Sequence, residues 1–331
     1  MKSFIQLKPN TKNLIRVKEF LFLMAIAYCT VTCKKADLAV LKTEVISEVG
    51  MTKATGGGTI TSDGGVDISA RGVCWSETDN PTTADSKTSD GSGSGSFQSH
   101  LTGLKPGTTY YLRAYAINSA GTSYGSSISF TTFDVEDADA NGYNTVVIGT
   151  QVWLKQNLKT THFQNGDAIS RVSSDAEWSN STGPGYCYYN NDLSKASEYG
   201  NLYNFYTVED SRNVCPTGWR VASMDDWIVL MRTLGDEFTA DVKIREAGTS
   251  HWVKDVGADN STGFTFLPGG NREGDGKYFN LSSRGNLWTS TIWIENGISA
   301  GWLVGLEWDH PQIRTCPYSK TYGASIRCIK N

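Results

Sequence analysis

Apolar and polar side chains alternate with a period of two within residues 101–132. The clearest part is YYLRAYAI, 110–117, where successive side chains would point to opposite faces of a strand. Upstream, short β-type runs are separated by the turn sequences TGGG, SDGG and SETDNPTT. This stretch has no helical period, so the pattern predicts an all-β sandwich over residues 38–132.

A tyrosine follows a Pro-Gly turn in LKPGTTY, 104–110. Tyr110 stands six residues after Leu104, a spacing typical of a tyrosine corner, in which the hydroxyl ties a strand to the turn before it. With its strands, this domain resembles fibronectin type III domains, which recur in bacterial surface proteins. The stretch GSGSGS, 91–96, is then a loop or edge inside the sandwich, and the domain boundary falls within 131–142.

A helical period replaces the strand period after residue 222. Four apolar residues recur at i, i+3, i+4 and i+7, the stripe of a helix packed on a core: Trp227, Leu230, Met231 and Leu234. Ser223 is a suitable N-cap, Asp226 at N3 completes a capping box, and Gly235 ends the helix. Shorter helices are expected within 199–210 and over 239–247. The rest is strand and loop, so residues 134–331 predict an α+β domain.

Length and charge limit the classes of protein. The chain has 331 residues, which favours two or three domains, and a formal net charge of -4 with a pI of about 5.6. It has no Lys/Arg cluster after the first 33 residues, so a nucleic-acid partner is excluded. Aromatic residues make up 11%, which argues against disorder.

The first 33 residues have the features of an export signal. A basic segment comes first, with Lys8, Lys12, Arg16 and Lys18. The apolar run FLFLMAIAY, 20–28, is too short to span a bilayer. TVTC then ends in Cys33, which predicts a lipoprotein signal peptide over residues 1–33 and lipidation of Cys33. The alternative is ordinary signal-peptidase cleavage with a soluble product. A lipid would anchor the protein to the outer membrane, on the cell-surface or the periplasmic face.

Export to an oxidising compartment changes the expected chemical state of the cysteines. Of seven, Cys29 would leave with the signal, and Cys74, in the core strand ARGVCWS, is expected to be a buried free thiol. Four remain after residue 186: Cys187, Cys215, Cys316 and Cys328. An even set in an oxidising compartment predicts two disulfides, and the sequence leaves all three connectivities open.

Several motifs of the second domain resemble one family. In order, these are YNTVVIGTQVWLKQNLKTT, GYCYYNND, YGNLYNFYTV, CPTGWRVASMDDW, GFTFLPGGNR, LWTST and YGASIRCIKN. They look like the Fibrobacter major paralogous domain family and cover nearly all of 134–331. The resemblance implies a C-type-lectin-like fold, shared with formylglycine-generating-type proteins. In that fold a cysteine near the first helix is bridged to the final strand, which implies a Cys215–Cys328 disulfide and leaves Cys187 and Cys316 as the second pair.

Motifs for catalysis or metal binding are weak. The four histidines form no metal-spacing motif, and neither a nucleophile elbow nor a P-loop is present. DADANG, 137–142, starts like a calcium loop but has Ile148 where a glutamate is needed, so a hairpin turn is favoured. EWDHP, 307–311, could hold a cation, but a solvated hairpin tip is the simpler interpretation. We therefore predict no catalytic residue, no metal and no cofactor.

The remaining prediction is a non-catalytic binding or adhesion lipoprotein, with a glycan or a surface protein as its partner. Lectin-like folds carry ligands on late loops, and aromatic faces stack on sugar rings. This resemblance and the local aromatic density select four residues: Arg272, Tyr278, Trp288 and Trp293. The alternatives are an enzyme on the formylglycine-generating-type fold and a purely structural envelope protein.

Overall fold

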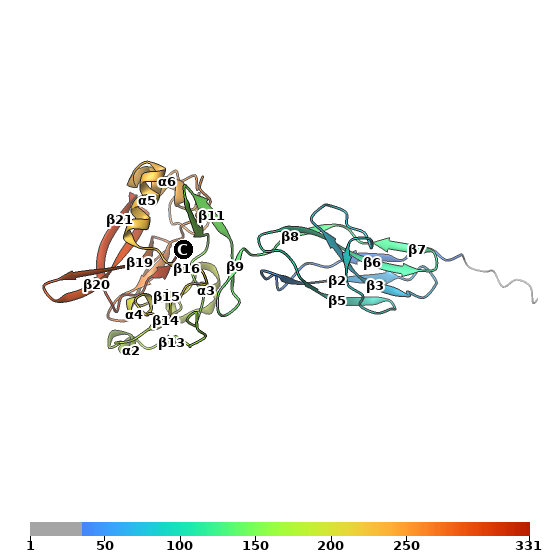
Figure 1. The fold of residues 1–331 in the computed structure, drawn as a ribbon, viewed down its shortest axis with the longest axis horizontal. Helices are drawn as coiled ribbons and strands as arrows, with labels where there is room; N and C mark the ends of the chain where they lie inside the picture. The colour runs from blue at the N-terminus through green and yellow to red at the C-terminus, as the bar shows by residue number, and fades with distance from the viewer. Residues whose placement is uncertain (1–34) are drawn as a thin grey trace, which may run out of the picture.

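The computed structural model describes residues 35–331, and Figure 1 shows two β-rich bodies that follow one another along the chain. The predicted signal peptide and Cys33 lie outside the described residues. Within residues 35–331, no helix is both long and apolar enough to cross a membrane.

The first body is a β-sandwich of eight strands. These are β1 (Val40–Thr43), β2 (Lys53–Ser62), β3 (Ala70–Ser76), β4 (Ser86–Lys87), β5 (Gly95–Thr102), β6 (Thr109–Asn118), β7 (Gly121–Tyr124) and β8 (Ile128–Thr131). One sheet has the order β1-β2-β5, and the other has the order β4-β3-β6-β7, with β8 also paired to β6. Gly95 pairs with Ile60, so the glycine- and serine-rich stretch runs into a strand of the sandwich, as predicted.

The predicted tyrosine corner is confirmed. The backbone N–H of Lys105 donates to the hydroxyl of Tyr110 over 3.0 Å, and the Tyr110 ring stacks on Phe130 inside the core. Cys74 is a buried free thiol, also as predicted, and burial raises its pKa to about 11. The first body is therefore a fibronectin- and immunoglobulin-like sandwich with its own apolar core.

A hairpin of β9 (Val135–Glu136) and β10 (Gly142–Tyr143) opens the second body. Its turn is the DADANG stretch, in which the Asp137 carboxylate accepts hydrogen bonds from the backbone and side chain of Asn141. The Tyr143 hydroxyl also donates to Asp137, over 2.5 Å. These bonds make Asp137 part of a closed turn, as the sequence favoured over a calcium loop.

Small sheets and one large sheet make up the second body. The strands are β11 (Thr145–Ile148), β12 (Gln151–Leu154), β13 (Ser170–Arg171), β14 (Gly185–Cys187), β15 (Leu202–Tyr203), β16 (Trp219–Val221), β17 (Gly269–Arg272), β18 (Tyr278–Leu281), β19 (Arg284–Glu295), β20 (Ile298–Glu307), β21 (His310–Ser319), β22 (Ser325–Ile326) and β23 (Cys328–Lys330). The large sheet has the order β18-β17-β19-β20-β21, with β22 on β19, and β23 lies between β12 and β16.

Short helices cover these sheets (Figure 1). They are α2 (Asp175–Ser179), the 3-10 turn η1 (Tyr189–Asn191), α3 (Leu193–Tyr199), α4 (Phe205–Val208), α5 (Met224–Leu234) and α6 (Glu237–Ile244). The predicted capping box of α5 is present: Ser223 and Asp226 exchange side-chain-to-backbone hydrogen bonds, and Gly235 is the C-cap.

Alternate side chains of β19 and β20 enter two different cores. Leu287 and Val304 pack into the core that contains residues of α5 and α6, whereas Trp288 and Leu303 pack into the other core. This alternation is the ordinary consequence of the strand period of two. The helices α5 and α6 cover one side of the large sheet. On the opposite side, the part of the sheet near β21 carries polar residues.

Within residues 35–331, one disulfide joins Cys215, ahead of α5, to Cys328 in the last strand. This is the pairing that the family resemblance implied. The second expected pair, Cys187 with Cys316, is wrong, because both thiols are free. Cys187 is enclosed by Trp178 and Leu202, whereas Cys316 is exposed on β21.

Candidate functional site

Two of the four predicted ligand-binding residues are buried and cannot contact a ligand. Arg272 has a fully buried side chain that donates to the carbonyls of Val172 and Gly276. Its guanidinium also lies over the rings of Trp178 and Tyr278. Arg272 therefore crosslinks segments of the interior, and the prediction that it binds a ligand is wrong.

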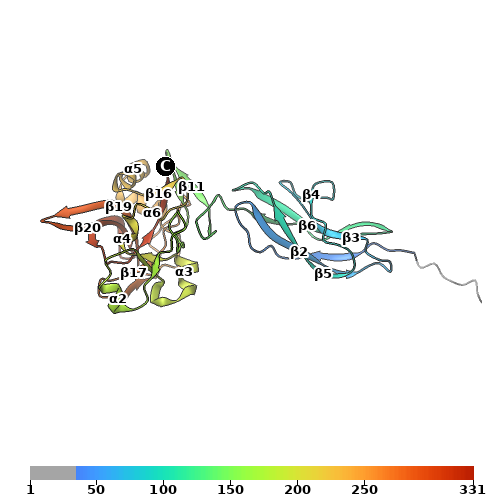
Figure 2. The same ribbon diagram turned by 60° about the horizontal axis from the view of Figure 1, so that its bottom comes forward.

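Trp288 is equally enclosed. Its indole N–H donates to the carbonyl of Tyr203 over 2.7 Å, and its ring meets Phe205 and Tyr322 edge to face. Tyr278 is half-buried against Arg272, and Trp293 is half-buried on the β19–β20 hairpin, which extends away from the body (Figures 1 and 2). With two members inside the protein, the four residues do not form one surface.

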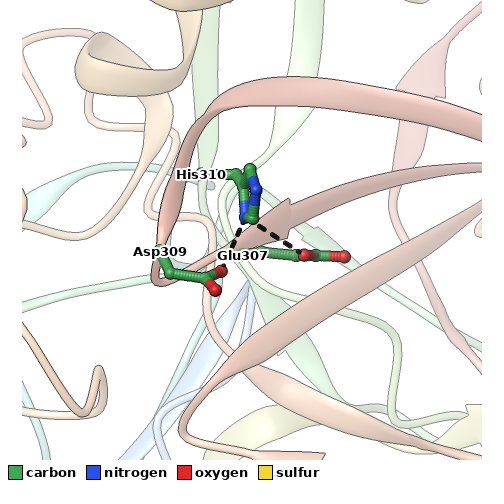
Figure 3. A group of neighbouring side chains, drawn as sticks. All are labelled: Glu307, Asp309 and His310. Carbon is green, nitrogen blue, oxygen red and sulfur yellow. Dashed lines mark hydrogen bonds and ion pairs between the residues drawn. The ribbon is translucent and has the colours of Figure 1, made fainter.

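The EWDHP stretch is a hairpin tip, as the sequence favoured (Figure 3). The imidazole Nδ1 of His310 lies 2.9 Å from Asp309 Oδ1 and 3.8 Å from Glu307 Oε2. Glu307 also pairs with two arginines, Arg284 and Arg314, at 2.5 Å and 2.8 Å. Because two guanidinium groups already neutralise Glu307, this cluster of possible ligand atoms is a poor environment for a cation.

A groove of about 460 Å³ lies elsewhere, where three segments of the second body meet. The β9–β10 turn provides Asp139 and Asn141, the segment after β12 provides Lys159 and Thr161, and α3 with its flanks provides the rest. That last group is Tyr188, Leu193, Ala196, Ser197 and Asn201. Polar groups from all three segments thus line the groove, together with apolar side chains from the segment around α3.

Asp139 fixes the polar wall. Its carboxylate accepts from the backbone N–H of Thr161 at 2.5 Å and from the Thr160 hydroxyl at 2.9 Å, and it lies 2.5 Å from Nδ1 of His162. Burial acts to raise the pKa of Asp139, but these hydrogen bonds together hold that pKa below its ordinary value. Asp139 is therefore a charged anchor whose oxygens are already occupied.

Lys159 supplies a donor to the same wall. Its ammonium group donates to the carbonyl of Ser197 over 2.8 Å, which uses one of three N–H bonds. Burial lowers the pKa of Lys159, and the negative charge of Asp137 opposes that shift. Two N–H bonds of Lys159 are left for water or for a ligand in the groove.

Asn201 lines the groove although only 1% of its surface is exposed. Its amide N–H bonds go to the carbonyls of Lys159 and Thr160, which fixes the orientation of the side chain. Among residues 35–331, no group donates a hydrogen bond to its Oδ1. Oδ1 of Asn201 and the ammonium group of Lys159 therefore line the same groove, each with unused hydrogen-bonding capacity.

The wall provided by α3 and its flanks also carries apolar side chains. Leu193, at the start of α3, lines the groove and is 66% exposed. The half-buried ring of Tyr188 carries the guanidinium of Arg171 at 4.7 Å from its centroid. An aromatic ring and an aliphatic side chain thus line the same groove as the hydrogen-bonding groups.

Sequence reasoning missed this groove. Its residues come from segments up to 62 positions apart, between Asp139 and Asn201, and no local motif joins them. The only signal was the pair of motifs QNLKTT and GYCYYNND, which were used for the resemblance and were not assigned to a site.

Comparison with known proteins gives one family. Residues 146–330 match the model of the Fibrobacter succinogenes major domain. No curated protein matches the chain.

Among solved structures, the chain is similar to the sensor domain of the anti-sigma factor RsgI4 of Pseudobacteroides cellulosolvens, with 21% identity, 30% of this chain and 97% of that chain covered, and a TM-score of 0.23. It is also similar to a fibronectin type III domain of the human KIAA0970 protein, with 18% identity, coverage of 28% and 72%, and a TM-score of 0.20.

Proposed function

Because the chain belongs to the Fibrobacter succinogenes major domain family, whose model covers residues 146–330, we propose that it is an exported, non-catalytic binding protein. In this proposal a lipid on Cys33 anchors it to the outer membrane, the sandwich acts as a spacer, and the second body binds the ligand. We assign the second body to the C-type-lectin-like folds. The order of α5, α6 and late hairpins supports this, as does the disulfide between the α5 approach and the last strand.

The observation that carries the binding function is the groove between Asp139, Tyr188 and Asn201. It combines apolar side chains with a preoriented acceptor and unused ammonium donors, and ligand sites typically have this composition. Its charges are held in fixed positions, since Asp139 and Lys159 are both tied to backbone groups.

The chemistry of the groove favours a saccharide. A sugar ring has an apolar C–H face, which suits Leu193 and Tyr188, and hydroxyl groups that both donate and accept. Lys159 can donate to such hydroxyls, and Oδ1 of Asn201 can accept from them. The volume of about 460 Å³ falls in the range of small-molecule sites.

A glycan array probed with the full chain tests the proposal. We expect binding to at least one saccharide class, and a loss of roughly tenfold or more in affinity for the double variant Lys159→Met/Leu193→Ser. The control is Lys155→Met/Val147→Ser, because Val147 is 67% exposed, like Leu193, and neither residue lines the groove. Absence of binding to any saccharide, or equal losses in both double variants, would contradict the saccharide assignment.

A further inference from the structure

A second hollow, of about 330 Å³, lies on the large sheet over β19, β20 and β21. It opens on the side of the sheet opposite α5 and α6. On β21 the strand period of two directs Arg314, Cys316 and Tyr318 to this side, and Arg284 and Asn286 come from β19.

A glycine keeps the hollow open. Gly305 lies near the C-terminal end of β20, opposite Asn286 on one side and Arg314 on the other. A Cβ atom at Gly305 would stand 2.9 Å from Oδ1 of Asn286, closer than side chains allow. The space above this strand therefore depends on the absence of a side chain at Gly305.

Two arginines in the hollow have unused hydrogen-bond donors. Glu307 holds Arg284 through one carboxylate oxygen and Arg314 through the other. Each guanidinium has five N–H bonds, and within residues 35–331 Glu307 is the only acceptor that either one meets. A buried arginine of this protein has more acceptors: Arg327 donates to the carbonyls of Leu154, Phe264 and Thr265.

The charges favour an anion between the two arginines. Around Glu307 itself, two guanidinium groups face one carboxylate, an excess of one positive charge that Glu273 offsets in part from its position near Arg284. Glu273 lies at the rim near Arg284, where it accepts a hydrogen bond from Asn271. Burial raises the pKa of Glu273, and the charge of Arg284 opposes this shift. Glu307 thus orients both guanidinium groups while their outer N–H bonds stay free.

We propose that this hollow binds the oxyanion group of a small ligand, a carboxylate or a phosphate, between Arg284 and Arg314. The planar fork of a guanidinium matches two oxygens of either group. Asn286, with 5% of its surface exposed, and the half-buried Tyr318 supply polar contacts at the base. This site is separate from the saccharide groove, so each proposal can fail without the other.

Cys316 provides a reporter inside the hollow. It is exposed, whereas the other free thiols of the described chain, Cys74 and Cys187, are buried. Alkylation of Cys316 in the full chain can be followed by mass spectrometry of its peptide, with anionic iodoacetate and neutral iodoacetamide in parallel. We expect the rate ratio of iodoacetate to iodoacetamide to exceed that of the urea-unfolded chain by about threefold or more at low salt.

Variants and competitors make the test specific. Arg284→Gln/Arg314→Gln should return the ratio to the unfolded value, whereas Arg232→Gln, an exposed arginine on α5, should leave it unchanged. Arg314→Lys, which keeps the charge, should retain most of the effect. Millimolar citrate or inorganic phosphate should slow the iodoacetate reaction, and the stronger competitor identifies the preferred oxyanion. A ratio equal to that of the unfolded chain, or no protection by either anion, would overturn the proposal.

Discussion

Asp139 is the residue on which the polar wall of the proposed saccharide groove depends. One carboxylate holds the Thr160–Thr161 segment and His162, which are more than twenty positions away in the sequence. Since these hydrogen bonds lower the pKa of Asp139 in the folded protein, the ionised form contributes to stability.

The sign of the resulting pH dependence follows from this lowered pKa. The contribution of Asp139 is fully present above the ordinary carboxyl pKa of about 3.9, and it is lost as pH falls through the lower folded-state value. We expect Asp139→Asn to have a lower Tm at neutral pH and a smaller further loss of Tm between pH about 4.5 and about 2.5. Calorimetry across this range measures both effects. Glu295→Gln, at an exposed hairpin tip, is the control; the same acid slope in Asp139→Asn as in the wild type would refute the role of Asp139.

Side-chain burial is the property that the sequence predicted least well. The lectin-like resemblance and the local aromatic density favoured Arg272 as a ligand residue, yet the partners that bury it, Val172 and Ser173, lie about one hundred positions away, and no local pattern reveals them. Trp288 and Trp293 lie on one strand, and the strand period cannot distinguish a buried face from an exposed one when both faces carry apolar residues.

At the scale of elements, the sequence predicted correctly those features that depend on residues close together in the chain. The capping box of α5, the Tyr110 corner and the strand at 70–76 all appear where the sequence predicted them. The second disulfide failed because pairing depends on tertiary proximity: Cys187 lies inside one small sheet, and Cys316 lies on the edge strand of another. For the same reason the groove and the hollow could not be predicted.

The Cys215–Cys328 disulfide fixes the last strand beside β16. It spans a sequence separation of 113 residues, so its removal frees a long loop in the unfolded chain. We expect Cys215→Ala/Cys328→Ala to lower the free energy of unfolding by about 5 kcal/mol, on the chain-entropy scale for loops of this length. Urea denaturation without reductant measures this loss. The matched variant Cys187→Ala/Cys316→Ala should keep the Cys215–Cys328 disulfide intact. A cross-linked Cys187–Cys316 peptide that is found in the wild type and lost in this variant would contradict the free thiols.

At the scale of the whole molecule, the two bodies have separate apolar cores. The cores of the first body contain residues from Ala39 to Phe130, and those of the second contain residues from Tyr143 to Ile329. Between them, the backbone N–H of Met51 donates to Glu136, and Phe133 donates to Gly50, so few bonds join the bodies.

Limited proteolysis tests whether these bodies fold independently. The β9–β10 turn exposes Ala138 and Ala140, whereas Tyr143 is buried in the second core. We expect a stable fragment that begins between residues 131 and 142 and retains the disulfide. A first cut within 91–96 that releases a folded remainder would contradict the division, because this stretch leads into β5.

The first 33 residues carry the prediction of where the molecule lies in the cell. A basic segment and the apolar run 20–28 lead directly to Cys33, the arrangement of a lipoprotein signal. We expect a metabolic fatty-acid label to appear on the wild-type chain and to be absent from Cys33→Ser, because the acyl chain requires that thiol. Cys29→Ser is the matched control and should be labelled like the wild type. Protease treatment of intact cells then distinguishes the two membrane faces, since the exposed turn at Ala138–Ala140 is cut only on the cell surface. Equal labelling of the wild type and Cys33→Ser would refute the anchor and favour a soluble exported product.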